Sequence, residues 1–252
     1  MIISESWLRE WVDFDLDFAT LADRLTGAGL EASALTLVPL VSEAVIAGRI
    51  THLRPHPDAT NLSLCEVDSG PGPVIQVVCG ATNARVGMVT PLAMPGAILP
   101  DGSVIRPTTI RNQVSTGMLC SGAELGIDDS VSGLLDLDPA LVPGTSLNAH
   151  LDLGDQLLEV DLTPNRGDCL SLFGIARETA VVATGRLKIP SLARVRARSK
   201  LRREVDLACP AECPRYMGRI IKGLDTTSRS PDWIRERLRR CGIRSIDVLV
   251  DV

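Results

Sequence analysis

The sequence predicts an α+β multidomain protein, in which a discontinuous αβ domain carries an inserted β-barrel and is followed by the beginning of a mixed α/β domain. Two observations predict this class. Segments 1–39 and 152–195 both combine helices that have one apolar face with short apolar strands. Segment 40–151 instead has short apolar strands separated by Gly and Pro, which is typical of a small closed or partly closed barrel. Such an insertion is tolerated when its two ends lie close together at the surface.

Segment 1–39 is expected to form two helices and a strand. Ser4 is a suitable N-cap for a helix through Asp13, whose apolar face would comprise Trp7, Leu8, Trp11 and Val12. A second helix is expected to open at Asp17, to end at Gly27 to Gly29, and to bury Phe18, Leu21 and Leu25. A strand over 32–38 follows.

Segment 40–151 contains the apolar runs of the predicted barrel. Its expected strands cover residues 44–53, 62–67, 74–79, 88–93 and 105–110. One helical turn is expected at Ser121 to Glu124, where the residues match a capping box and Gly126 ends the turn.

Segment 152–195 returns to the αβ pattern. A strand over 157–162 leads into the turn from Thr163 to Asp168, and a helix follows that Gly185 ends. The inward face of this helix would comprise Leu172, Ile175, Ala176, Thr179, Ala180 and Ala183. If the insertion is correct, Ile175 and Ala180 share a core with Trp11 and Leu25.

Segment 196–252 is expected to begin a further domain. It has an apolar run at Gly218 to Ile221, a helical pattern from Ser230 to Arg240, and an apolar strand over 246–252. Pro231 and Gly242 stand where helices favour Pro at the start and Gly after the end. Because the sequence stops within a predicted strand, we expect it to be a segment of a longer polypeptide.

Charge is distributed unevenly along the chain. The net charge is −5, and segments 1–39, 40–151 and 152–252 carry −5, −5 and +5. Eight Lys or Arg and no acidic residue lie between Arg186 and Arg203. This stretch would attract a polyanion or serve as a solvated linker.

The composition is that of an ordinary globular protein. Neither a secretory signal nor an apolar run of about 18 residues occurs, so we expect a cytoplasmic protein without a membrane partner. The seven cysteines form an odd, scattered set, which is typical of reduced thiols, and we expect no disulfides.

The residues themselves predict no catalytic or metal site. Neither a Walker-type loop nor a Gly-x-Gly-x-x-Gly element occurs, so no bound cofactor is expected. The spacing of Cys209 and Cys213 suits half a zinc site, but no second ligand pair lies nearby. Asp161 and Asp168 would suit an acid/base pair of a hydrolase, or they hold the turn with Arg166 as an ion partner.

Three blocks of the predicted barrel occur together in order. They are Pro55-His56-Pro57-Asp58-Ala59-Thr60-Asn61-Leu62, then Gln76-Val77-Val78-Cys79-Gly80-Ala81-Thr82-Asn83, then Ser115-Thr116-Gly117-Met118-Leu119-Cys120-Ser121. Together they resemble the tRNA-binding OB-fold domain of synthetase-associated proteins.

The flanking segments resemble the N-terminal portion of the β subunit of bacterial-type phenylalanyl-tRNA synthetases. The residues that carry this resemblance are 163–171 (TPNRGDCLS), 174–178 (GIARE), 213–216 (CPRY), 231–234 (PDWI) and 242–246 (GIRSI). The resemblance implies that 1–39 and 152–195 form the two halves of domain B1, that 40–151 is the OB-fold domain B2, and that 196–252 begins the B3 editing region.

The resemblance also implies a function and partners. Family members are α2β2 class II aminoacyl-tRNA synthetases that use ATP and Mg²⁺ to attach phenylalanine to tRNA(Phe), with the active site on α. No catalytic or metal-binding residue is carried over to this segment, and the editing-site residues are expected beyond Val252. A free-standing OB-fold tRNA-binding protein is the alternative.

Weak RNA binding is expected of the barrel itself. Segment 40–151 contains no Phe, Trp or Tyr and carries −5, whereas single strands are usually held by basic grooves and aromatic faces. Asn61 and Asn112 replace a Lys and a Gly that related modules often have. The candidate RNA-binding residues are Arg49, Arg54, His56, Asn83, Arg85 and Arg111.

Overall fold

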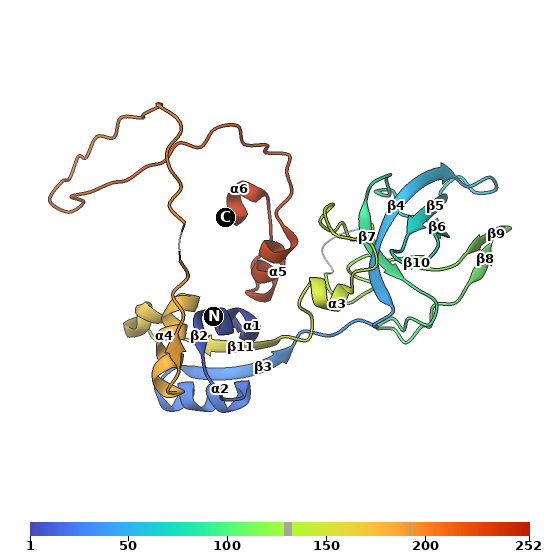
Figure 1. Ribbon diagram of the computed structural model, residues 1–252. Coiled ribbons are helices and arrows are strands. Elements are labelled where there is room, and N and C mark those ends of the chain that lie inside the picture. The colour runs from blue at the N-terminus through green and yellow to red at the C-terminus, as the bar shows by residue number, and fades with distance from the viewer. Residues whose placement is uncertain (129–132, 192) are drawn as a thin grey trace.

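The computed structural model describes residues 1–128, 133–191 and 193–252, and is a mixed α/β structure that contains a nearly closed five-stranded barrel (Figure 1). The first layer is an antiparallel sheet in the order β1 (Ile2–Ser4), β11 (Gln156–Asp161) and β3 (Glu31–Leu37). The middle strand therefore comes from a part of the chain far from its two neighbours. Leu158 pairs with Ile3 on one side and with Leu35 on the other.

Four helical elements surround this sheet. They are α1 (Glu5–Trp11), α2 (Phe18–Gly27), the 3₁₀ helix η1 (Pro164–Cys169) and α4 (Leu172–Val182). The predicted N-caps at Ser4 and Asp17 are confirmed, because their side chains accept hydrogen bonds from Trp7 N and Thr20 N at 3.3 and 2.8 Å. Helix α1 ends at Trp11, before the predicted Asp13, because β2 (Val12–Asp13) pairs with β12 (Arg186–Leu187).

One hydrophobic cluster joins the sheet and its helices. It contains Leu25 and Ile175, with Trp11 and Ala180 packed against it as partly buried members. The predicted packing of these four residues is confirmed. The two helices α2 and α4, which are separated by the whole barrel in sequence, thus exclude water from the same interior.

The barrel strands follow the predicted runs closely. The sheet order is β10 (Met118–Leu119), β7 (Val89–Ala93), β4 (Val45–Pro55), β5 (Ser63–Asp68) and β6 (Ile75–Cys79). Beside β6, Thr116 N donates to Gln76 O and Val78 N donates to Ser115 Oγ, at 2.9 and 3.0 Å. These bonds bring the two edges of the sheet together, since Ser115 and Thr116 lead directly into β10.

Two predictions within the barrel segment differ from the structure. The strand expected from residue 105 begins later, as β8 (Thr108–Ile110), and pairs with β9 (Gln113–Ser115), because Ile105 N is already bonded to Ala97 O. Residues 121–124 form the predicted capping-box bonds but only a turn. A helical turn not predicted, α3 (Leu147–His150), leaves the barrel with Ser146 as its N-cap.

Two strands predicted near the C-terminus are wrong. Residues 218–221 are exposed coil, and residues 246–252 include a short helix, α6 (Val248–Asp251). In the part of the chain that the structure describes, neither segment has a neighbouring strand with which to pair. Asp247 instead accepts hydrogen bonds from Leu249 N and Val250 N, which favours a helical start.

The predicted helix at 230–240 is present as α5 (Asp232–Arg240) and is held at both ends. At its C-terminal end the buried Arg240 side chain lies 2.8 Å from Asp155 Oδ2. At its N-terminal end Asp232 lies 2.9 Å from His150 Nε2 of α3. None of the described helices has both the length and the apolar composition needed to cross a bilayer.

Candidate nucleic-acid interface

The six predicted RNA-binding residues lie in four places on the barrel. Arg54 and His56 lie where β4 ends, and Arg111 lies in the β8–β9 turn. Arg49 lies in β4 itself, and Asn83 and Arg85 lie between β6 and β7. The structure therefore does not bring all six together on one face.

His56 is buried and hydrogen-bonded within the barrel. Only 4% of its surface is exposed. Its Nε2 donates to Ile110 O at 3.2 Å, and its Nδ1 accepts from Asp58 N at 3.0 Å. These two partners fix the neutral tautomer with the proton on Nε2. The ring thus joins the β4–β5 loop to the β8–β9 hairpin and has no nitrogen left for a phosphate.

Three other predicted residues hold the segment that follows residue 132. Asn83 bonds both Leu134 N and Leu134 O at 2.9 Å, as a neighbouring strand would. Arg85 pairs with Asp136 at 2.7 Å. Arg49 donates to the carbonyls of Pro139 and Leu141 at 2.9 and 3.0 Å. These contacts occupy donors of Asn83 and Arg49 and place a carboxylate against the charge of Arg85.

Besides Arg85, three arginines of the barrel are exposed. Arg54 reaches only Gln76 Oε1 at 3.5 Å, and Arg111 reaches only Asp58 O at 3.4 Å, so both contacts are weak. Arg106, which was not predicted, also lies on the surface, in the segment before β8. Within the described residues, none of the three has a carboxylate partner. Arg106 could have been identified from the sequence, because segment 40–151 has only five cations and the other four were predicted.

A groove of about 720 Å³ lies beside Arg106. Its lining is mainly apolar, and the polar side chains around it include Thr108, Ser115 and Glu124. Cys79 also lines the groove, and a hydrogen bond from Cys65 lowers the pKa of its thiol to about 7 although burial acts in the opposite direction. The groove offers one cation, one carboxylate and no aromatic ring, so it suits a neutral group better than a phosphate.

One group of potential metal ligands occurs in the described residues, and an arginine already occupies it. Asp168, Cys169 and Glu178 place their ligand atoms within 4.8 Å of one another. Arg166 lies 3.3 Å from Asp168 and 2.9 Å from Glu178, which confirms the predicted ion pair. This hydrogen-bonded guanidinium holds the pKa of Asp168 below its ordinary value of 3.8. The group therefore fits neither a Mg²⁺ ion nor the acid of a hydrolase.

Comparison with known proteins identifies two parts of the chain. Residues 45–146 match the family described as a tRNA binding domain. Residues 212–252 match the family described as a B3/4 domain. The first match covers the barrel from β4 to the end of its last loop, and the second begins beyond the basic stretch.

Similar proteins cover the whole chain. Over 252 residues it is 45% identical to the phenylalanine–tRNA ligase beta subunit of Methylococcus capsulatus, and the match covers 100% of this chain and 32% of that protein. It is 46% identical to the beta subunit of the same name from Nitrosococcus oceani, again over 100% of this chain and 32% of the relative. The corresponding protein of Bordetella parapertussis is 44% identical over 100% of this chain and 31% of its own length. The chain thus spans about a third of the length of these relatives.

Proposed function

We propose that this chain supplies RNA-binding and structural domains to the enzyme that charges tRNA(Phe). The reason is that the chain is homologous over its whole length to part of the phenylalanine–tRNA ligase β subunit. The observation that carries this proposal is an overall identity of about 45% in alignments that include both flanks as well as the barrel. A free-standing tRNA-binding protein would need to match only in the barrel.

The domain division we propose follows the predicted boundaries. Residues 1–39 and 152–195 form one αβ domain, 40–151 form the inserted OB-fold domain, and 196–252 begin the B3 region. Support comes from the entry and exit of the barrel, where Val38 N donates to Asp155 O at 2.8 Å and Gly154 N donates to Val38 O at 3.0 Å. The chain thus leaves the αβ domain and returns to it at neighbouring backbone positions, which is what a tolerated insertion requires.

The catalytic step is proposed to take place outside this chain. ATP and Mg²⁺ would bind to the α subunit of an α2β2 assembly in the cytoplasm. The described residues support this placement, because their one group of potential metal ligands is filled by Arg166. The role left for this chain is to pack, to orient partner domains and to contact tRNA.

Binding of tRNA by the barrel itself is proposed to be weak. Arg54, Arg106 and Arg111 are its exposed cations without a carboxylate among the described residues, while the segment carries −5 overall. Few phosphate contacts give affinities near those of non-specific binding, roughly 1–100 μM at physiological salt. Fluorescence anisotropy titrations of tRNA(Phe) with the chain and with its variant R54Q/R106Q/R111Q, at roughly physiological ionic strength, measure what the barrel contributes. A loss of affinity above about tenfold in the variant, or 1.4 kcal/mol, would contradict weak binding by the barrel.

The enzymatic role is tested in the complete assembly. The full reading frame that contains this chain, expressed with its α subunit, is expected to attach phenylalanine to tRNA(Phe), and removal of residues 45–146 should reduce kcat/KM for tRNA by less than about tenfold, or 1.4 kcal/mol. The neighbouring backbone positions at the barrel's entry and exit make this deletion feasible. Failure of the intact assembly to charge tRNA would overturn the proposal. A loss above a hundredfold on deletion would overturn only the minor role of the barrel.

A further inference from the structure

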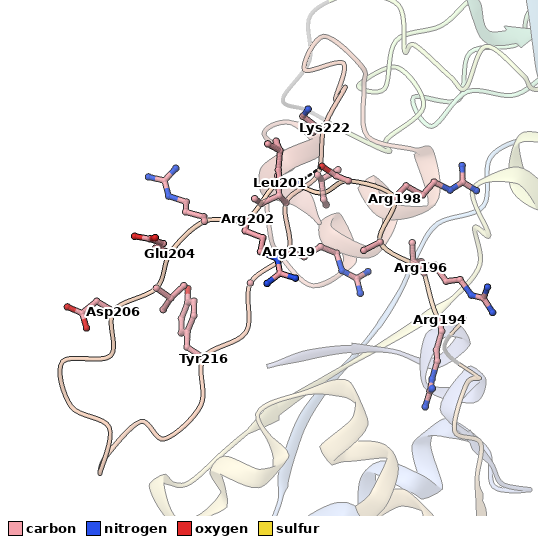
Figure 2. Close-up of a pocket in the computed structure, with 18 of the residues that line it drawn as sticks. Arg194, Arg196, Arg198, Leu201, Arg202, Glu204, Asp206, Tyr216, Arg219 and Lys222 are labelled. Carbon is pink, nitrogen blue, oxygen red and sulfur yellow. Dashed lines mark hydrogen bonds between the residues drawn. The ribbon is translucent and has the colours of Figure 1, made fainter.

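A row of arginines lies on the extended segment that follows the αβ unit. The sequence from Arg194 to Arg198 alternates arginine with Val195 and Ala197. Side chains two residues apart in an extended chain leave the same side, about 6.6 Å from each other. Figure 2 shows Arg194, Arg196 and Arg198 leaving one side of this segment. The spacing in the sequence and the direction of the side chains agree.

The returning part of the chain adds a further cation and an aromatic ring. Arg219 lies beside the three arginines in Figure 2, and all four line one cleft of about 2000 Å³. Tyr216 lines the same cleft and is 65% exposed. The two carboxylates of the cleft, Glu204 and Asp206, lie at the end near Tyr216 and away from the arginine row (Figure 2). Arg202 lies beside Glu204 in Figure 2, so a cation opposes the carboxylates at that end, and among the described residues the arginine row has no carboxylate next to it.

The charges of this row are available for binding. Arg194, Arg196, Arg198 and Arg219 are all exposed. Across the described residues, none of the four takes part in an ion pair. Most other arginines of the C-terminal segment, such as Arg229, Arg237 and Arg240, are paired with carboxylates. Within the described residues, the charge of the row is therefore not neutralised by a carboxylate.

From this arrangement we infer that Arg194, Arg196, Arg198 and Arg219 form an RNA phosphate-binding row, the main electrostatic contact of this chain with tRNA. Two features favour an RNA backbone over an acidic protein. Arg194, Arg196 and Arg198 occur at every second residue, and an exposed aromatic ring for base stacking shares the cleft. Two further features favour an anion of either kind. Arginine forms paired hydrogen bonds with phosphate oxygens as well as with carboxylates, and residues 186–203 carry +8 whereas the rest of the chain carries −13. The inference rests on the proposed function only for the identity of the RNA.

Salt dependence tests the row directly in the 252-residue chain. Four phosphate contacts on single-stranded RNA predict a slope of log K against log salt of about −2.8, or roughly a 50-fold loss of affinity between 50 and 200 mM salt. The triple variant R194Q/R196Q/R198Q leaves one contact, so its slope should fall to about −0.7 and the loss to roughly threefold. Fluorescein-labelled tRNA(Phe) transcript and a 15-nucleotide single strand are the probes.

Three controls distinguish the arginine row from the other cations of the chain and from a loss of folding. The matched variant R54Q/R106Q/R111Q removes the same charge from the barrel and should change the slope less. The variant R194K/R196K/R198K should restore most of the slope, because it keeps the charge but not the paired hydrogen bonds. Circular dichroism establishes that each variant is folded.

Two outcomes would overturn the inference. One is an unchanged slope in R194Q/R196Q/R198Q, or a larger effect of the barrel variant. The other is displacement of RNA by polyglutamate of equal charge as effectively as by unlabelled RNA, which would indicate a surface for acidic proteins. Neither result affects the charging assay of the complete assembly, so failure of the row is distinguishable from failure of the proposed function.

Discussion

The buried ion pair between Asp155 and Arg240 provides the sharpest test of how α5 is held. Asp155 Oδ2 lies 2.8 Å from Arg240 Nη1 and also accepts from Ser4 Oγ at 2.5 Å. Its other oxygen, Oδ1, accepts from the backbone N–H groups of Ser6 and Gln156 at 3.0 and 2.9 Å. Both carboxylate oxygens therefore face donors only. The substitution D155N must turn its amide N–H₂ toward one of these donor sets.

The magnitude follows from what Arg240 retains. Removing one partner of a buried pair costs about 3–5 kcal/mol. Arg240 keeps hydrogen bonds to the carbonyls of Leu151 and Asp152, and Asp152 offers a carboxylate 3.3 Å away whose side chain is 66% exposed. We therefore expect D155N to lower the free energy of unfolding by about 3 kcal/mol, the lower end of that range.

Urea unfolding followed by tryptophan fluorescence measures this loss, because Trp233 lies on α5 and Trp7 lies on α1. The control E10Q breaks the pair of Arg237 with Glu10, whose side chain is 54% exposed, and should cost less than about 1 kcal/mol. The double variant D155N/R240M should lose about 2 kcal/mol less unfolding free energy than the sum of the losses in D155N and R240M. The reason is that no unpaired charge stays buried in the double variant. A loss in D155N no larger than in E10Q would refute the reasoning.

Three further predictions concern the other contacts. Burial would raise the pKa of Asp232, but hydrogen bonds from His150 and Asp138 N, with Arg229 nearby, hold it below its ordinary 3.8. The ionised Asp232 carboxylate therefore stabilises the fold above pH 3.8, and this stabilisation is lost as the pH falls through the folded-state pKa. The urea midpoints of the wild type and D232N should converge on acidification from pH 6 to 3. A constant difference between the two midpoints would contradict this prediction. G174A should destabilise by about 1–3 kcal/mol in thermal melts because a Cβ would lie 2.1 Å from Asp168 O, whereas G167A, with nothing within 4 Å, should be nearly neutral. H56F leaves Ile110 O and Asp58 N unpaired, so it should lower the free energy of unfolding by about 1–3 kcal/mol and speed proteolysis of the β4–β5 loop. The control H52A removes a ring that is 78% exposed and should have neither effect.

The sequence was sufficient where structure depends on near neighbours. Ser4 and Asp17 cap their helices through residues three positions away, so the pattern alone predicts them. The apolar runs of the barrel were equally clear because Gly and Pro separate them. Local signals also fixed the turn at Arg166, whose carboxylate partner Asp168 is two residues away.

The errors arose where the partner is distant or missing. Apolar residues at 218–221 and 246–252 fit a strand, but a strand needs a neighbour, and the described chain provides none there. The hydrogen bonds of His56 and Asn83 could not be predicted either. Their partners, Ile110 and Leu134, lie more than 50 residues away in both cases, so only the coordinates identify these bonds, and RNA contacts by the two residues stay a prediction.

The central position of β11 sets an order of events during synthesis. Strand β3 emerges from the ribosome about 120 residues, and β1 about 150 residues, before the strand that must lie between them. At about 5–20 residues per second, the N-terminal helices wait roughly 6–24 s with their apolar faces uncovered. The barrel can close during this interval, because its strands are contiguous in sequence. A nascent chain halted before residue 156 should therefore present a finished barrel beside an unfinished, chaperone-binding N-terminus.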